Sequence, residues 1–251
     1  MKVWLNGNIL SERAARIAPN DRGFLLADGL FETCLVIAGD IVQLDDHLER
    51  LRNGIAYLGI TMIYNDVDLS DAMERLLIAN DLEDASIRLT VTRGGGPRGL
   101  SPVVTENATV IITCAPYVPP LLEPARVMVS DIRRNENSPL CNIKTLNYLD
   151  NIMALRYAKD AGFDDAIMLN CKGNVACTTA ANIFMRLGEK LVTPALSEGA
   201  LPGVTRKAVI AKARAKGQFV EEGFLNLDDL RMADEIFITN SLIGKRNILS
   251  F

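Results

Sequence analysis

Apolar and polar residues follow both strand and helix periods along this chain. Ile87, Leu89 and Val91 alternate with polar neighbours, which predicts a half-buried strand. Apolar residues at positions 48, 51, 55 and 58 recur at helical spacing after Asp45 and Asp46, two suitable cap residues, so a helix is predicted there. The presence of both periods in one chain predicts an α/β fold.

Shorter signals predict the other elements. Asn6-Gly7, between residues 2–5 and 8–10, is a strong hairpin signal, and residues 20–23 predict a turn. A helix is predicted after position 148, with Leu149, Ile152, Met153 and Tyr157 on its apolar face. The remaining predictions are strands at 126–130, 165–170, 182–187 and 235–239, and helices at 69–79 and from 204 to about 216, while residues 30–36 form a further run left without a predicted element.

A proline-rich segment divides the chain. Four prolines lie between positions 116 and 124, where they stiffen the backbone and remove hydrogen-bond donors. We therefore expect residues 116–125 to link an N-terminal α/β domain, residues 1–115, to a C-terminal domain, residues 126–251.

Charge and cysteine content limit the partners and the compartment. A net charge of −4, without a lysine or arginine run, gives no electrostatic case for nucleic acid or an anionic membrane. The chain has no signal segment and no apolar run near the ~20 residues that span a bilayer. Five cysteines, an odd number without a C-x-x-C pair, favour reduced thiols. We expect a soluble, cytoplasmic protein.

The single histidine, His47, limits the chemistry that the chain can perform alone. Zinc sites built on several histidines are excluded, and no cysteine pair could replace them, so no metal site is expected. A Ser-His-Asp triad lacks the G-x-S-x-G turn that would carry its serine. A difficult reaction here would therefore need a cofactor.

Lys144 is the candidate that organises the chemistry. Its neighbours Ile143, Leu146 and Asn147 are apolar or amide side chains, and it lies between a predicted strand and a predicted helix. Desolvation or nearby positive charge can make a lysine amine nucleophilic, so we interpret Lys144 as forming a Schiff base with an aldehyde cofactor. The alternative is a lysine at a helix start that extends into water.

Two further positions suggest a phosphate site. Gly203, Val204 and Thr205 open a predicted helix, where free backbone N–H groups and a hydroxyl suit a phosphate. Arg50, one helical turn beyond His47, could supply a cation to the same phosphate. The alternatives are a plain helix cap by Thr205 and a solvated helix arginine.

A glycine-rich run follows the predicted strand that contains Ile87. Three successive glycines after Arg93 let the backbone turn tightly and approach a ligand, and the guanidinium of Arg98 suits a carboxylate. The alternative is a flexible hairpin with a solvated arginine. The run is not a P-loop, because G-K-[ST] is missing.

Together these residues resemble the class IV aminotransferases, the fold type IV pyridoxal-phosphate enzymes, over nearly the whole chain. That family includes D-amino-acid and branched-chain aminotransferases and 4-amino-4-deoxychorismate lyase. The matching motifs are Asp21-Arg22-Gly23, Asp28 to Thr33, His47 to Leu51, Thr92-Arg93-Gly94, Arg98-Gly99, Lys144 with Asn147-Tyr148-Leu149, Ala181 to Phe184, Leu201 to Arg206, and Thr239-Asn240-Ser241.

The resemblance implies a fold, a cofactor and residue roles. It implies a smaller N-terminal α/β domain and a larger C-terminal pseudo-barrel domain, with the active site at their interface, and at least a homodimer. The cofactor would be pyridoxal 5'-phosphate and the substrate a small amino compound with a carboxylate. Lys144 would hold the aldehyde and shuttle protons. The implied cofactor-binding residues are Arg50, Tyr148, Cys177, Ala180, Ala181, Val204 and Thr205, and the implied substrate residues are Phe31, Thr33 and Arg98.

Two positions depart from the family pattern. Most members place a glutamate five residues before the asparagine of the Asn182-Ile183-Phe184 motif, where it pairs with the cofactor's pyridine nitrogen; this chain has Cys177. A thiol, with an ordinary pKa of about 8.5, is a weaker partner than a carboxylate. Leu35 replaces a common basic residue on the substrate side.

Within the family, the motifs favour the lyase, which releases pyruvate to leave 4-aminobenzoate for folate synthesis. Residues 31–33, 93–99 and 239–241 look lyase-like, and Leu100 disfavours the D-amino-acid enzymes, which carry a histidine in this neighbourhood. A weak electron sink is better tolerated by the lyase than by a transaminase with two half-reactions. The alternatives are a D-amino-acid or branched-chain aminotransferase, and a cofactor-impaired, non-enzymatic homologue.

Overall fold

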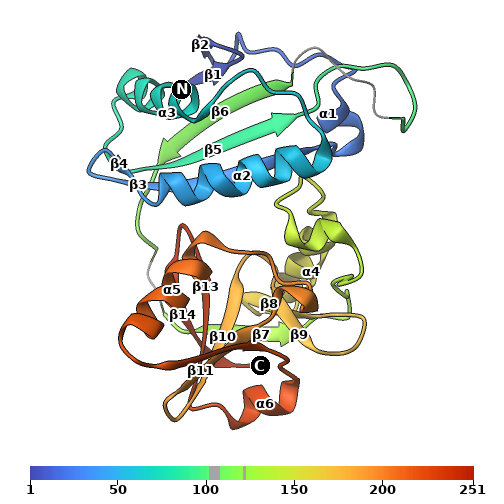
Figure 1. Ribbon diagram of the computed structural model, residues 1–251, viewed down its shortest axis with the longest axis vertical. Helices are drawn as coiled ribbons and strands as arrows, with labels where there is room; N and C mark the ends of the chain where they lie inside the picture. The colour runs from blue at the N-terminus through green and yellow to red at the C-terminus, as the bar shows by residue number, and fades with distance from the viewer. Residues whose placement is uncertain (102–107, 121–122) are drawn as a thin grey trace. The chain divides into compact units, whose positions relative to one another are not determined.

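A computed structural model describes residues 1–101, 108–120 and 123–251 (Figure 1). The chain forms two compact units, Met1–Val118 with Lys144–Asn147, and Pro119–Ile143 with Tyr148–Phe251. Lys144–Asn147 thus belongs to the first unit, although it falls within the segment 126–251 that we assigned to the C-terminal domain. The expected linker, 116–125, includes residues 121–122, which lie outside the described residues, and the expected domain boundaries remain a proposal.

The first unit is built on an antiparallel six-stranded sheet with the order β2-β1-β6-β5-β3-β4. Its strands are β1 (Lys2–Leu5), β2 (Asn8–Ser11), β3 (Gly29–Ile37), β4 (Asp40–Ile41), β5 (Ala85–Thr92) and β6 (Thr109–Pro116). The predicted hairpin is confirmed, because Leu5 pairs with Asn8 across Asn6 and Gly7, which have φ of 47° and 93°. Strands β4 and β6 were not predicted from the sequence.

Helices α1 (Arg22–Leu26), α2 (Leu44–Leu58) and α3 (Asp66–Asn80) accompany this sheet. The predicted turn at 20–23 is instead the start of α1, which Asp21 caps by accepting from the N–H groups of Gly23 and Phe24. The predicted capping of α2 by Asp45 and Asp46 is wrong. The helix begins earlier, after a left-handed Gln43, and both aspartates lie in its first turn.

The core of the first unit lies between the sheet and two of these helices. Helix α2 packs on β3, and α3 packs on β1 and β6 (Figure 1). The predicted alternation is confirmed for residues 87–91, because Ile87, Leu89 and Val91 are fully buried in β5 and Arg88 is exposed, whereas Thr92 is buried and donates to Asp21.

The second unit contains an eight-stranded mixed sheet with the order β12-β11-β10-β13-β14-β7-β8-β9. Its strands are β7 (Ala125–Val129), β8 (Asp165–Leu169), β9 (Val175–Thr178), β10 (Asn182–Leu187), β11 (Lys190–Pro194), β12 (Phe219–Gly223), β13 (Glu235–Asn240) and β14 (Gly244–Ser250). One buried cluster joins Val175 of β9 to Ile183 of β10 and Val192 of β11. Strands far apart in the sheet order share this core, so the sheet curls on itself, as expected for the pseudo-barrel.

The helices of the second unit are α4 (Leu149–Asp160), α5 (Val204–Ala215) and α6 (Leu227–Met232), with 3-10 turns at Pro139–Asn142 and Leu196–Glu198. Helix α5 confirms the helix predicted from residue 204 to about residue 216. The predicted apolar face of α4 is wrong, because Leu149, Ile152 and Tyr157 are exposed, and the buried residues of α4 are Asn151, Ala154 and Ala158. Small side chains let this helix approach β8 closely. None of the helices in the described ranges is both long enough and apolar enough to cross a membrane.

Candidate functional site

Backbone hydrogen bonds hold Lys144 against the start of strand β3. The Phe31 N–H donates to the Lys144 carbonyl at 3.0 Å, and the Leu146 N–H donates to the Gly29 carbonyl at 3.0 Å. The Lys144 Nζ lies 4.2 Å from the centroid of the Phe31 ring, and the lysine is half-buried rather than fully exposed. The pairing fixes where the lysine leaves the backbone, and the ring supports its side chain.

The same ring carries a second cation that sequence reasoning missed. Arg88 Cζ lies 3.8 Å from the Phe31 centroid, and Arg88 pairs with Thr33 across β5 and β3. Arg88 thus lies over the Phe31 ring and opposite Thr33, so both predicted substrate residues have a cationic neighbour. Phe31 is buried and Thr33 is half-buried. The signal was the arginine within an alternating strand, but only the strand register identifies its neighbours.

The opposite face of β3 carries a buried carboxylate between two basic residues of α2. Arg50 donates to Glu32 through Nε at 2.8 Å and Nη2 at 2.6 Å, and His47 Nδ1 lies 2.7 Å from Glu32 Oε2. His47 and Glu32 have side chains only 1% exposed. Arg50 is therefore not the solvated arginine of the alternative interpretation.

Electrostatics keep this carboxylate ionised. Burial would raise the pKa of Glu32, but hydrogen bonds from Arg50 and His47, together with their charges, hold that pKa below its ordinary value. A glutamate within the apolar run of residues 30–36 was a signal for such a site, because a buried charge requires a partner. The interaction orients Arg50, whose proposed phosphate contact remains a prediction.

Three segments of the second unit meet at Asn182, the first residue of β10. Its Nδ2 donates to the Leu201 carbonyl at 2.8 Å, just before α5. Asn182 pairs with Thr239 at the end of β13, and it follows the turn that contains the predicted residues Ala180 and Ala181. Asn240, the last residue of β13, donates through Nδ2 to the Ala180 carbonyl at 3.2 Å. This bond ties the turn before β10 to the turn that follows β13.

The start of α5 suits an anion. Gly203 is the N-cap residue and provides no side-chain cap, and the first turn contains no acidic residue. Thr205 lies inside the helix, so the alternative that it caps the helix is wrong. An ideal Cβ at Gly203 would lie 2.0 Å from Asn182 Oδ1, so only glycine allows this close approach.

Two buried hydroxyl groups lie at the ends of the strands that lead into these turns. Thr178 and Thr239 are each 1% exposed, and their Oγ1 atoms make no hydrogen bond among the described residues. An unsatisfied buried polar group costs about 1–3 kcal/mol, so both hydroxyls favour a polar ligand or a water molecule.

Cys177 lies in an apolar environment. It is buried with Ala154, Met168 and Ala176, and Ile132 packs against the group. Burial raises the pKa of its thiol to about 11, so the group is neutral at physiological pH. The side chain at the position expected for the pyridine-nitrogen partner therefore provides no charge.

The segment before Lys144 is fixed by two side chains that sequence reasoning missed. Asn142 Nδ2 donates to the carbonyls of Leu196 and Ala200, at 3.0 and 2.8 Å. Arg134 donates to the carbonyls of Cys141 and Gly199, at 2.8 and 3.2 Å. No sequence signal identified these contacts, because carbonyl partners are set by the path of the chain.

Three further residues singled out from the sequence differ in exposure. Tyr148 is half-buried at the N-cap position of α4, Leu35 is half-buried in β3, and Arg98 is exposed. Their proposed roles near the cofactor and the substrate remain predictions.

A family model described as "Amino-transferase class IV" matches residues 29–251. The chain belongs to the class IV aminotransferase family. This membership identifies it as an enzyme of a family of aminotransferases and lyases.

Known relatives of this class IV enzyme differ in their described activities. It is 37% identical to a putative branched-chain-amino-acid aminotransferase of Methanocaldococcus jannaschii, covering 96% of this chain and 84% of the relative. It is 32% identical to the aminodeoxychorismate lyase of Bacillus subtilis, covering 96% and 83%. The structure of a branched-chain aminotransferase from Thermoproteus uzoniensis with norvaline matches with a TM-score of 0.93 at 30% identity, covering 100% and 86%. These matches confirm the predicted fold type.

Each unit of this class IV enzyme carries groups that suit part of a phosphorylated aldehyde. In the second unit, the start of α5 has no side-chain cap and no acidic residue in its first turn, which suits a phosphate. Lys144 provides an amine on an aromatic ring. Cys177, where the resemblance predicts the partner of the pyridine nitrogen, provides a neutral, buried thiol.

We expect Glu32→Gln to destabilise the first unit by about 3 kcal/mol at pH 7, because it leaves Arg50 and His47 buried without their carboxylate. A folded-state pKa below the ordinary value means that Glu32 stabilises the fold fully above about pH 4.3. That contribution is lost as the pH falls towards the folded-state pKa. Urea unfolding of both proteins from pH 7 to pH 3 should therefore show a difference that shrinks under acid.

The matched control is Glu74→Gln, which changes an exposed glutamate of α3. It should leave the free energy of unfolding within about 0.5 kcal/mol of the parent value. A Glu32→Gln protein as stable as the parent at pH 7 would contradict the role given to the ion pair.

Proposed function

We propose that this enzyme uses pyridoxal 5'-phosphate, held by Lys144, and acts on the amino group of a small substrate that carries a carboxylate. When bound, the cofactor withdraws electrons from the carbon that bears the substrate's amino group. The half-buried Lys144 amine provides both the covalent attachment and a base that can move a proton.

The other proposed roles rest on the resemblance, with support from local contacts. The N–H groups of Val204 and Thr205 and the backbone around Ala180 and Ala181 would hold the phosphate, and Arg50 would supply a positive charge to it. Tyr148 would bind the ring oxygen, and Cys177 would be the partner of the ring nitrogen. Phe31 and Thr33 contact the substrate, and Arg98 pairs with its carboxylate.

Within this class we propose a 4-amino-4-deoxychorismate lyase. The neutral, buried Cys177 carries the proposal. Without a carboxylate partner, the pyridine nitrogen is less readily protonated and the cofactor is a weaker electron sink. Loss of pyruvate from aminodeoxychorismate gains driving force from aromatisation, and it leaves the cofactor in its aldehyde form. The reaction therefore depends less on a strong sink than a two-step transamination does.

An aminotransferase is the second candidate. It is favoured by the 37% identity to the putative branched-chain-amino-acid aminotransferase. In that case the holoprotein would pass its substrate's amino group to the cofactor and then to a 2-oxo acid.

The two functions are distinguished by supplying the holoprotein with aminodeoxychorismate and with D- and L-amino acids side by side. We expect release of pyruvate and 4-aminobenzoate, and only slow formation of the pyridoxamine form of the cofactor with the amino acids. Rapid pyridoxamine formation and transfer to a 2-oxo acid, without pyruvate release from aminodeoxychorismate, would replace the lyase with the aminotransferase.

We expect Cys177→Glu to strengthen the electron sink. A carboxylate beside the ring nitrogen should accelerate pyridoxamine formation by about tenfold or more, the factor that corresponds to one pKa unit. The change would be followed by stopped-flow absorbance of the cofactor. Cys177→Gln is the control, because it adds similar volume without charge and should not accelerate the reaction. Equal rates for the two variants would contradict the role assigned to Cys177.

A further inference from the structure

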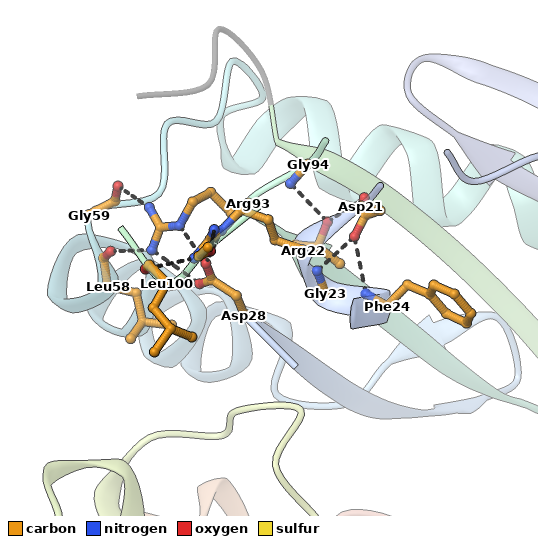
Figure 2. A network of polar contacts seen from close by, with 12 residues as sticks. Asp21, Arg22, Gly23, Phe24, Asp28, Leu58, Gly59, Arg93, Gly94 and Leu100 are labelled. Carbon is orange, nitrogen blue, oxygen red and sulfur yellow. Dashed lines mark hydrogen bonds and ion pairs between the residues drawn. The ribbon is translucent and has the colours of Figure 1, made fainter. Parts of the chain in front are cut away.

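A buried cluster of charges lies where β3 begins and β5 ends (Figure 2). Asp28 Oδ2 accepts from Arg22 Nε at 2.8 Å and from Arg93 Nε at 2.7 Å, and Asp28 Oδ1 accepts from Arg93 Nη2 at 3.1 Å. The side chains of Arg22 and Arg93 are 6% and 8% exposed. Two buried guanidinium groups therefore share one carboxylate, and we refer to Arg22, Asp28 and Arg93 as the arginine clamp.

Backbone carbonyls accept further hydrogen bonds from both arginines of the clamp. Arg93 donates to the carbonyls of Leu58 and Gly59, at 2.7 and 2.8 Å, where α2 ends. Cations are favourable at this negative end of a helix. Arg22 donates to the carbonyls of Gly99 and Leu100, at 3.0 and 3.2 Å. Figure 2 shows these contacts converging on the guanidinium groups.

Arg22 of the clamp and its neighbour Asn20 hold the loop 94–100 at both ends. The Arg22 N–H donates to the Gly94 carbonyl at 2.9 Å, and the Gly96 N–H donates to the Asn20 carbonyl at 3.2 Å. At the far end, Arg22 binds the carbonyl of Gly99, the residue directly after Arg98. The backbone of Arg98 is thus fixed on either side, while its side chain is exposed.

We propose that Arg22 is a positioning residue for substrate binding: held by Asp28, it fixes the loop that presents Arg98 to the substrate carboxylate. This inference rests on the proposed function. The hydrogen bonds of Arg22 to the loop go to carbonyl oxygens, and its side chain packs beside Gly96, so it acts through the placement of Arg98. A lysine cannot replace it, because one ammonium group cannot reproduce the planar fork that spans a carboxylate and two successive carbonyls.

The electrostatics of Asp28 agree with this role. Burial would raise the pKa of Asp28, but hydrogen bonds from Arg93 and Arg22 and their charges hold that pKa below its ordinary value. The carboxylate therefore stays ionised at physiological pH and holds both guanidinium groups in place.

The test compares Arg22→Lys with the parent holoprotein in two measurements. Hydrogen exchange reports the amides of residues 94–100 without depending on activity, and steady-state kinetics report the amino substrate. We expect at least tenfold faster exchange in this loop. We also expect a KM raised by about tenfold with kcat within threefold, because a loosened loop misplaces one substrate contact. The absorbance and affinity of the bound cofactor should stay unchanged.

A double-mutant comparison tests whether the effect passes through Arg98. In an Arg98→Ala background, Arg22→Lys should cause little further rise in KM, because the contact it places is already absent. Arg75→Lys is the matched control, since Arg75 lies in the same unit, is exposed, and pairs with Asp71 at the surface. Asp28→Asn, which keeps the side-chain shape, replaces Arg22→Lys if that variant fails to fold.

The outcomes test two claims separately: that the clamp holds the loop, and that the held loop matters for substrate binding. Unchanged loop exchange overturns the clamp, whatever the activity. Faster exchange with unchanged KM, or a full additional loss in the Arg98→Ala background, overturns the link to substrate binding. If the parent protein turns over no amino substrate, the proposed function fails and Arg22 loses its substrate role, while the exchange measurement still shows whether the clamp holds the loop.

Discussion

The alternation of side chains along β3 is the constraint on which the candidate site in the first unit depends. Phe31 and Glu32 are neighbours in an extended strand, so they must point to opposite faces of the sheet. On one face, Phe31 contacts Lys144 and Arg88. On the other face, Glu32 binds His47 and Arg50 of α2. The aromatic support for the lysine and the ion pair that orients Arg50 are therefore fixed by a single register. A one-residue slip of this strand would exchange the two faces.

Buried or half-buried carboxylates link separate segments at several places in this protein. Glu32 joins β3 to α2, and Asp28 joins the start of β3 to the end of α2 and to the loop of Arg98. In the second unit, Glu198 accepts from Asn170 and Asn174, at 2.8 and 2.7 Å. Each carboxylate fixes segments that carry proposed functional residues or that adjoin them. Such groups hold their partners firmly but leave a costly buried charge when one partner is removed.

Local sequence chemistry predicted the elements whose signals are themselves local. The Asn6-Gly7 hairpin, strand β5 and helix α5 followed from turn residues and periodicity. The face of α4 did not, because its exposed Leu149 and Ile152 look like core residues until the packing of Ala154 and Ala158 is known. Lys144 and the start of α5 were identified as chemical candidates, whereas Arg88, Asn142 and Asn182 were not. Their partners are distant in sequence, and strand register or chain path brings them together.

The central claim is that the amine of Lys144 holds an aldehyde cofactor. The most direct measurement is to incubate the protein with pyridoxal 5'-phosphate, reduce it with borohydride, and locate the attached phosphopyridoxyl group by peptide mass spectrometry. The account predicts one modified site, at Lys144, and no stable yellow protein from a Lys144→Ala variant. Modification of another lysine, or a protein that stays colourless with the cofactor, would contradict the account.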